Sequence, residues 1–107
     1  MNGMTGEQFE RYVMQRLKAH GFQLISGTKK SGDFGADIIC YDGWFNRCVV
    51  QCKYYSNPVS IKAVQEINSA RQHYKASRAI VITNSTFTKP AMILAQECKV
   101  ELWALFK

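Results

Sequence analysis

The sequence predicts an α/β fold in which a mixed central sheet lies between layers of helices, in the order α-β-β-β-α-β-α-β. Three observations support this fold class. Apolar residues recur at helical spacing in two segments, β-rich runs lie between them, and the stretch 78–83 is a short apolar run between two of the expected helices. Because a buried strand between helices is typical of parallel pairing, we expect a crossover connection in the second half of the chain.

The first helix is expected from about Gly6 to His20. Thr5 can cap it, Gln8 occupies the capping-box position, and Gly21 suits its C-terminal stop. An apolar stripe for packing on the sheet is formed by Phe9, Val13 and Leu17.

Three strands are expected next, over 22–26, 36–41 and 47–54. The glycine-rich, charged segment 27–35 between the first two strands predicts an exposed loop. The segment 42–46 joins the second and third strands as a hairpin loop.

The second half of the chain alternates helices and strands. Residues 60–74 carry apolar positions at helical spacing, and the buried strand 78–83 follows them. Thr88 can cap a last helix that runs to about Cys98, and 100–106 makes the final strand. We therefore expect one domain over residues 1–107.

The register of the hairpin decides which polar residues share a site. Side chains alternate along a strand, so Gln51 and Lys53 lie on one face of the sheet. A two-residue turn would bring Asp37 to the other face. Pairing Tyr41 with Arg47 across the loop 42–46 instead places Asp37 opposite Gln51. We predict this second register.

Such a cluster suits metal chemistry. Magnesium or manganese prefers hard oxygen ligands, which the Asp37 carboxylate, the Gln51 side-chain oxygen and the Cys52 backbone carbonyl could supply. Lys53 could orient or deprotonate an attacking water and stabilise negative charge in a phosphoryl transition state. Glu10 lies beside the apolar stripe of the first helix, where it can reach the sheet as a further ligand.

Charge and cysteine content indicate the partner and the compartment. Fourteen Lys and Arg against eight Asp and Glu give a formal net charge of +6, which favours a polyanionic partner, nucleic acid before membrane. The four cysteines form no C-x-x-C pair, and the chain starts with neither a signal peptide nor a lipidation motif. These features predict a cytoplasmic protein with reduced thiols and no membrane span.

Three motifs resemble one nuclease family. Phe9-Glu10, the run Gly32-Asp33-Phe34-Gly35-Ala36-Asp37 and Val50-Gln51-Cys52-Lys53 are similar to the Mrr-type restriction endonuclease branch of the PD-(D/E)xK superfamily, which uses Gln-x-Lys. The similarity extends from about Gly6 to Leu102. It implies a restriction-endonuclease-like three-layer α/β/α core.

The resemblance also implies an activity, namely metal-dependent hydrolysis of DNA that leaves 5′-phosphates. Asp37, Gln51 and Lys53 match the family motif, and Glu10 matches its helical acid. Gln51 stands where most members of the wider superfamily have an acidic ligand, so we expect weaker metal binding and one ion before substrate binds.

Basic and aromatic residues are candidates for contacts with DNA, although each alone is more often a solvated charge or a packing residue. The candidates are Lys29, Lys30, Tyr54, Tyr55, Lys62, Arg71 and Lys89.

Several functions remain compatible with the sequence. A restriction or defence endonuclease that cuts as a homodimer, or with a delivery partner, is the first. A structure-selective nuclease such as a junction resolvase or a repair enzyme is the second. A toxin domain held by an inhibitor and a DNA-binding protein without cleavage activity are the others.

Overall fold

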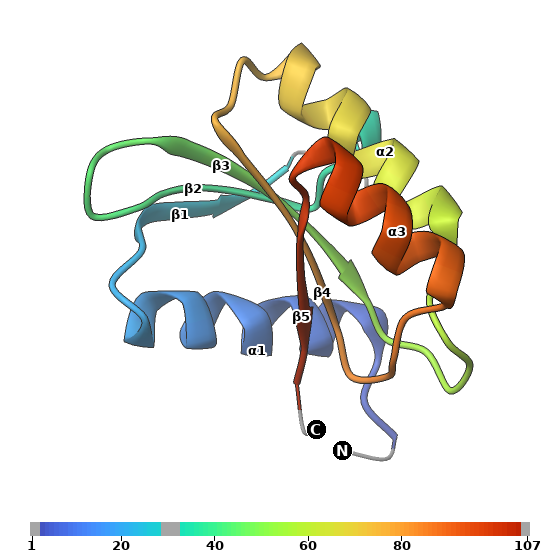
Figure 1. Ribbon diagram of the computed structural model, residues 1–107. Helices are drawn as coiled ribbons and strands as arrows, with labels where there is room; N and C mark the ends of the chain where they lie inside the picture. Colours follow the sequence, from blue (N-terminus) through green and yellow to red (C-terminus); the bar gives the residue numbers. More distant parts are fainter. Residues whose placement is uncertain (1–2, 29–32, 106–107) are drawn as a thin grey trace.

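The computed structural model describes residues 3–28 and 33–105, which form a five-stranded sheet with helices on both faces (Figure 1). The elements follow the predicted order: α1 (Gly6–Ala19), β1 (Gln23–Gly27), the short 3-10 helix η1 (Asp33–Gly35), β2 (Ile38–Tyr41), β3 (Arg47–Lys53), α2 (Ile61–His73), β4 (Arg78–Thr83), α3 (Lys89–Cys98) and β5 (Glu101–Ala104).

The strands lie in the sheet in chain order, β1-β2-β3-β4-β5. The pairs β1–β2 and β2–β3 are antiparallel, whereas β3–β4 and β4–β5 are parallel. The helices α2 and α3 make the two crossovers that parallel pairing requires. The mixed sheet and the parallel second half are therefore confirmed.

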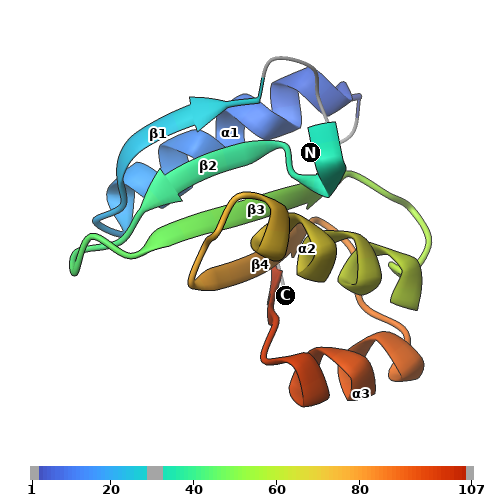
Figure 2. The same ribbon diagram turned by 90° about the horizontal axis from the view of Figure 1, so that it is seen from above.

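Two hydrophobic clusters, one on each face, hold the layers together. The stripe Phe9, Val13 and Leu17 of α1 is fully buried against one face of the sheet. On the other face α2 and α3 cover a second cluster that includes Val49 and Val81 of the central strands. The turned view in Figure 2 separates α1 from the layer of α2 and α3 across the sheet.

The ends of α1 are fixed as predicted. The Thr5 hydroxyl accepts from the Gln8 backbone N–H at 3.1 Å, and the Thr5 N–H donates to Gln8 Oε1 at 2.8 Å. This reciprocal capping box satisfies two backbone N–H donors at the start of the helix. His20 is the C-cap residue, and Gly21 follows with φ +90°.

The hairpin register is the predicted one. Tyr41 pairs with Arg47, and Ile38 pairs with Val50. The Asp37 N–H donates to the Val50 carbonyl at 2.8 Å, so Asp37 continues this register and lies opposite Gln51.

Some boundaries differ from the prediction. The strand expected from residue 36 begins at Ile38, because Phe34 adopts a left-handed conformation (φ 51°) and the chain becomes extended only after this turn. The strand β5 ends at Ala104, and Phe106, where it was expected to end, lies outside the described residues.

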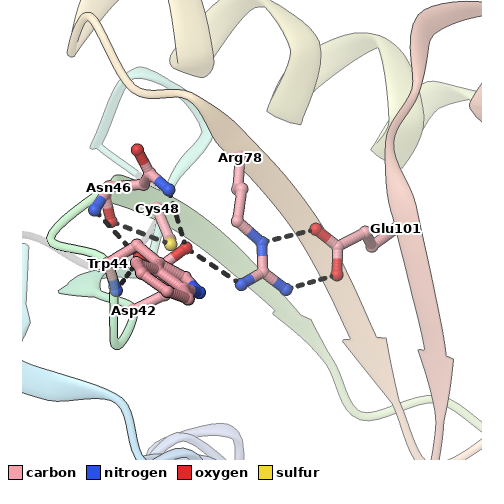
Figure 3. A network of polar contacts seen from close by, with 6 residues as sticks. All are labelled: Asp42, Trp44, Asn46, Cys48, Arg78 and Glu101. Carbon is pink, nitrogen blue, oxygen red and sulfur yellow. Dashed lines mark hydrogen bonds and ion pairs between the residues drawn. The ribbon is translucent and has the colours of Figure 1, made fainter.

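A polar network anchors the end of the sheet that carries the hairpin loop (Figure 3). Arg78 on β4 contacts both oxygens of Glu101 on β5, at 2.8 and 2.7 Å, and Asp42 Oδ2 at 3.2 Å. The Asp42 carboxylate also accepts from the backbone N–H groups of Trp44 and Asn46, each at 2.9 Å. The network thus ties the loop to the two parallel strands.

The same contacts shift the ionisation of both charged partners. Burial raises the pKa of Asp42, but hydrogen bonds from Asn46, Trp44 and Arg78 outweigh it and hold that pKa below 3.8. The hydrogen bonds to Glu101 raise the pKa of Arg78. Both groups therefore stay charged near neutral pH.

None of the helices in the described part of the chain combines the length and the apolar character that crossing a bilayer requires.

Candidate active site

An open cleft of about 880 Å³ lies where β3 ends and where α1 and α2 begin. The five residues predicted to act at a metal site, Glu10, Asp37, Gln51, Cys52 and Lys53, all line it. They come from α1, from the segment before β2 and from the last residues of β3. The structure thus brings together side chains that lie up to 43 positions apart, from residue 10 to residue 53.

Asp37 is fixed in the cleft by a backbone group of the neighbouring strand. Its carboxylate Oδ2 accepts from the Cys52 backbone N–H at 2.7 Å, and the residue is 6% exposed. A buried carboxylate needs such a hydrogen bond, because burying it without one costs several kcal/mol of folding free energy. The contact aligns Asp37 with the end of β3.

The Gln51 amide has a fixed orientation. Its Nε2 donates to the Gly35 carbonyl at 3.2 Å and to Glu66 Oε1 at 3.1 Å. Because both partners are acceptors, the amino group must face them, and Oε1 faces the other way. This Oε1 is buried and finds no hydrogen-bond partner among the described residues.

Glu66 on α2 was not among the predicted site residues. Besides accepting from Gln51, its carboxylate lies 3.9 Å from Lys53 Nζ. A helical stripe in the sequence could have indicated it, since four polar residues spaced three or four apart on α2 line the cleft: Lys62, Glu66, Ser69 and His73.

Lys53 projects into the cleft between two partners. Its side chain is 23% exposed, and Nζ lies 3.9 Å from the Glu66 carboxylate and 5.6 Å from the centre of the Tyr55 ring. The carboxylate and the aromatic face both attract the ammonium group electrostatically. A positive group is thereby held next to Gln51 and Asp37.

Glu10 and Asp37 both act on the Cys52 thiol. Burial raises the pKa of Cys52 well above 9.0, and the negative charges of Asp37 and Glu10 raise it further. The two carboxylates line the same cleft as this residue. Since this thiol stays protonated, the group that Cys52 can offer a cation is its backbone carbonyl.

The donor set fits a hard divalent cation. In the part of the chain that the structure describes, no three His, Cys, Asp or Glu side chains are grouped closely enough to hold a metal ion by themselves. The candidate set relies instead on two carboxylates, a backbone carbonyl and the unpartnered Gln51 Oε1. Oxygen donors of these types are the ligands of magnesium and manganese.

Gly35 allows the loop to approach α2. A Cβ atom at this position would lie 2.6 Å from the Glu66 carbonyl oxygen, and φ is +85°. Any other residue would meet both the clash and the left-handed backbone. The close approach brings the Gly35 carbonyl within reach of the Gln51 amide.

The predicted DNA contacts divide into two groups by position. Tyr55 and Lys62 line the cleft, and Lys89 is exposed at the first position of α3. The parallel strands β3 and β4 both end at this edge of the sheet, so the start of α3 also belongs to it.

Two other candidates are engaged elsewhere. Arg71 lies at the far end of α2 and donates to the carbonyls of Cys98 and Lys99, at 2.7 and 3.2 Å, so it caps α3. Tyr54 packs on Phe9 with ring centres 5.3 Å apart. Both side chains thus make contacts within the domain, and their DNA contacts stay predictions. Lys29 and Lys30 lie outside the described residues.

Comparisons with known proteins agree with the fold and the motifs. The sequence matches the Mrr catalytic family, described as restriction endonuclease, over residues 1–105. Comparison with curated proteins gave no significant match.

Solved structures show the same fold. A repair endonuclease from Pyrococcus abyssi superposes with a TM-score of 0.70 at 19% identity, over 98% of this chain and 49% of that one. EndoMS in a complex with double-stranded DNA gives 0.74 at 18% identity, over 98% and 46%. EndoMS in apo form gives a TM-score of 0.69 at 17% identity, over 98% of this chain and 48% of that one.

The present chain spans about half the length of these structures. At this level of identity the likeness shows the fold, which is the restriction-endonuclease-like α/β/α sandwich predicted from the sequence. Together with the family match over nearly the whole chain, it shows that the protein belongs to the Mrr-type restriction endonuclease family of the PD-(D/E)xK superfamily.

Proposed function

We propose that this domain is a metal-dependent endodeoxyribonuclease of the restriction type, which hydrolyses phosphodiester bonds and leaves 5′-phosphates. The observation that carries the proposal is the buried Gln51 Oε1, which lacks a partner among the described residues and lies in the same cleft as Asp37 and Lys53. A buried oxygen of this kind is costly unless a cation or a water completes it.

The proposed ligands of a magnesium or manganese ion are the Asp37 and Glu10 carboxylates, Gln51 Oε1 and the Cys52 backbone carbonyl. A divalent cation held there would neutralise charge on the phosphate. The hydrogen bonds of Asp37 to Cys52 and of Gln51 to Glu66 keep these oxygens in place before substrate arrives.

Lys53 is the proposed catalytic cation. In hydrolysis a water loses a proton as its oxygen forms a bond to phosphorus. The bond from phosphorus to the 3′-oxygen breaks, and that oxygen takes up a proton, so the net reaction adds one water. Lys53 lines the cleft, and its Nζ can orient the water and stabilise the extra negative charge of the transition state. Lys62 and Lys89 are proposed to contact phosphates farther along the strand.

Supercoiled plasmid, linear duplex and a four-way junction, each incubated with the protein and magnesium, manganese or EDTA, test this proposal. We expect cutting that requires the metal, disappears in Asp37→Ala and falls about 100-fold or more in Lys53→Ala. Lys18→Ala, an exposed lysine near the other end of α1, is the matched control and should cut like the wild type. Equal cutting by Lys53→Ala and Lys18→Ala would exclude the proposed role.

The choice of substrate separates two biological roles. Cutting of plasmid and linear duplex supports restriction, whereas a preference for the junction supports a structure-selective nuclease. DNA binding without cutting of any substrate would favour the non-catalytic alternative.

We also propose that two copies act together, because cutting both strands of a duplex needs two active sites. Sedimentation at micromolar concentration with and without DNA tests this. A monomer under both conditions, in a protein that makes double-strand breaks, would contradict it.

A further inference from the structure

A pair of stacked aromatic rings forms part of the cleft wall. The rings of Phe34 and His73 have centres 3.7 Å apart and planes inclined by 19°, and both residues line the cleft. Tyr74 meets both rings edge-on, with ring centres 6.2 Å from Phe34 and 4.8 Å from His73. Phe34 nevertheless remains 63% exposed.

The backbone holds Phe34 in this exposed position. Phe34 has φ 51° and ψ 27°, a left-handed conformation that bulky residues rarely adopt. The next residue, Gly35, lies close to the carbonyl of Glu66. Glu66 precedes His73 on α2 by two helical turns. The contact between the loop and α2 therefore fixes the Phe34 ring over His73.

The stack adjoins the proposed metal ligands. The Gly35 carbonyl accepts from the Gln51 amide at 3.2 Å, so Phe34 is one residue away from a direct partner of Gln51. His73 covers one face of the Phe34 ring, and the exposure of that ring leaves room for a further aromatic plane. The chemistry that fits beside a phosphate site is a nucleobase, because every base offers a π-face for stacking.

We propose that Phe34 and His73 form a stacking site for an unpaired nucleobase adjacent to the scissile phosphate. The inference rests on the proposed nuclease function, and within that function it favours the structure-selective role over cutting of an intact duplex. In an intact duplex each base is stacked between its neighbours, and unstacking it costs free energy. The site therefore favours DNA with an unpaired base near the cut, such as a bulge, a gap or a branch point.

Binding experiments with 2-aminopurine test the proposal without cleavage. The fluorescent base is placed at an unpaired position of a gapped duplex, and at a paired position of an intact duplex, with calcium in place of magnesium. Because stacking quenches 2-aminopurine, we expect wild-type protein to lower the fluorescence of the gapped DNA. Phe34→Leu should lose this quenching and bind the gapped DNA about tenfold more weakly, with unchanged affinity for the intact duplex.

Variants at three positions separate stacking from a structural role. Phe34→Trp keeps an aromatic plane and should retain the quenching. His73→Ala removes the second ring from the exposed end of α2 and should weaken it, which provides a test even if Phe34→Leu does not fold. Phe45→Leu is the matched control, since Phe45 is also exposed (72%) with φ 62° but lies in the hairpin loop.

The outcomes distinguish this inference from the proposed function. If the wild type binds and cuts DNA but Phe34→Leu and His73→Ala quench and bind like Phe45→Leu, the stacking site is wrong and the nuclease assignment stands. If the wild type binds neither DNA, both fail.

Discussion

The side-chain amide of Gln51 on β3 donates to the carboxylate of Glu66 on α2 at 3.1 Å, which ties the central strand to a helix inside the cleft. The same amino group donates to the Gly35 carbonyl. An ionised glutamate at position 51 would have no proton for either acceptor. The glutamine at position 51, in place of the acid common in the wider superfamily, is thus matched to the glutamate at position 66.

Exchanging the two side chains tests this match. Gln51→Glu alone should lower the free energy of unfolding by about 1–3 kcal/mol, because it places two carboxylates together and leaves the Gly35 carbonyl without its donor. Adding Glu66→Gln restores a donor and should recover part of the loss, with a coupling of about 0.5–3 kcal/mol. Urea unfolding of the wild type, the two single variants and the double variant gives this coupling free energy. Additive effects would show that the two residues are not energetically coupled.

Metal binding should depend on Glu66 even though it is not a proposed ligand. Glu66→Ala removes an acceptor that orients Gln51 Oε1, and loss of such a supporting contact typically weakens metal binding by about 10- to 100-fold. Glu66→Gln retains an acceptor oxygen and should lie closer to the wild type. Calorimetric titration with manganese gives the affinities. Glu97→Ala, an exposed glutamate on α3, controls for the lost charge, and an equal effect of that variant would refute the orienting role.

The loop contact with α2 makes Gly35 a sensitive position. Gly35→Ala would place its Cβ 2.6 Å from the Glu66 carbonyl at φ +85°, so we expect a loss of about 1–3 kcal/mol in unfolding free energy. Gly43→Ala is the control, because no atom lies within 4 Å of its added Cβ. Its effect should stay within about 0.5 kcal/mol. Chemical denaturation compares the unfolding free energies of the two variants. Similar values would contradict a close contact between Gly35 and the Glu66 carbonyl.

The polar network at the hairpin end predicts an acid-sensitive contribution to stability. The pKa of Asp42 is lowered below 3.8 in the folded protein, so its stabilising effect is present above pH 3.8 and is lost as the pH falls through the lowered pKa. Asp42→Asn should therefore reduce Tm at neutral pH and approach the wild type in strong acid. Thermal unfolding of both proteins from pH 7 to pH 2 measures the difference. A difference that did not change with pH would argue against ionisation of Asp42 as its cause.

The hairpin and the helix caps could be predicted from the sequence, because each depends on residues only a few positions apart. The five-residue loop from Asp42 to Asn46 set the register, and the alternation of side chains then placed Asp37 opposite Gln51. The capping box of Thr5 and Gln8 and the Thr88 cap depend on residues three positions apart, so they too follow from the sequence.

The site residues that the sequence did not predict owe their positions to contacts between distant segments of the chain. Glu66 meets Gln51 only because α2 crosses over the end of β3, and Phe34 meets His73 only because Gly35 lets the loop approach that helix. Arg71 and Tyr54 were predicted to contact DNA from residue type alone. Their engagement with α3 and with Phe9 arises from packing that no local pattern encodes.

The sheet separates two hydrophobic clusters, and α1 belongs to just one of them. Proteins unfold locally in cooperative units, so an element that packs in its own cluster can unfold while the rest of the domain stays folded. Opening of α1 alone would remove Glu10 from the cleft and would leave the contact between Gln51 and Glu66 in place on the opposite face. If Glu10 is a ligand as proposed, the fraction of molecules with all four proposed ligands in place would depend on the opening equilibrium of one helix, whose free energy is smaller than that of global unfolding.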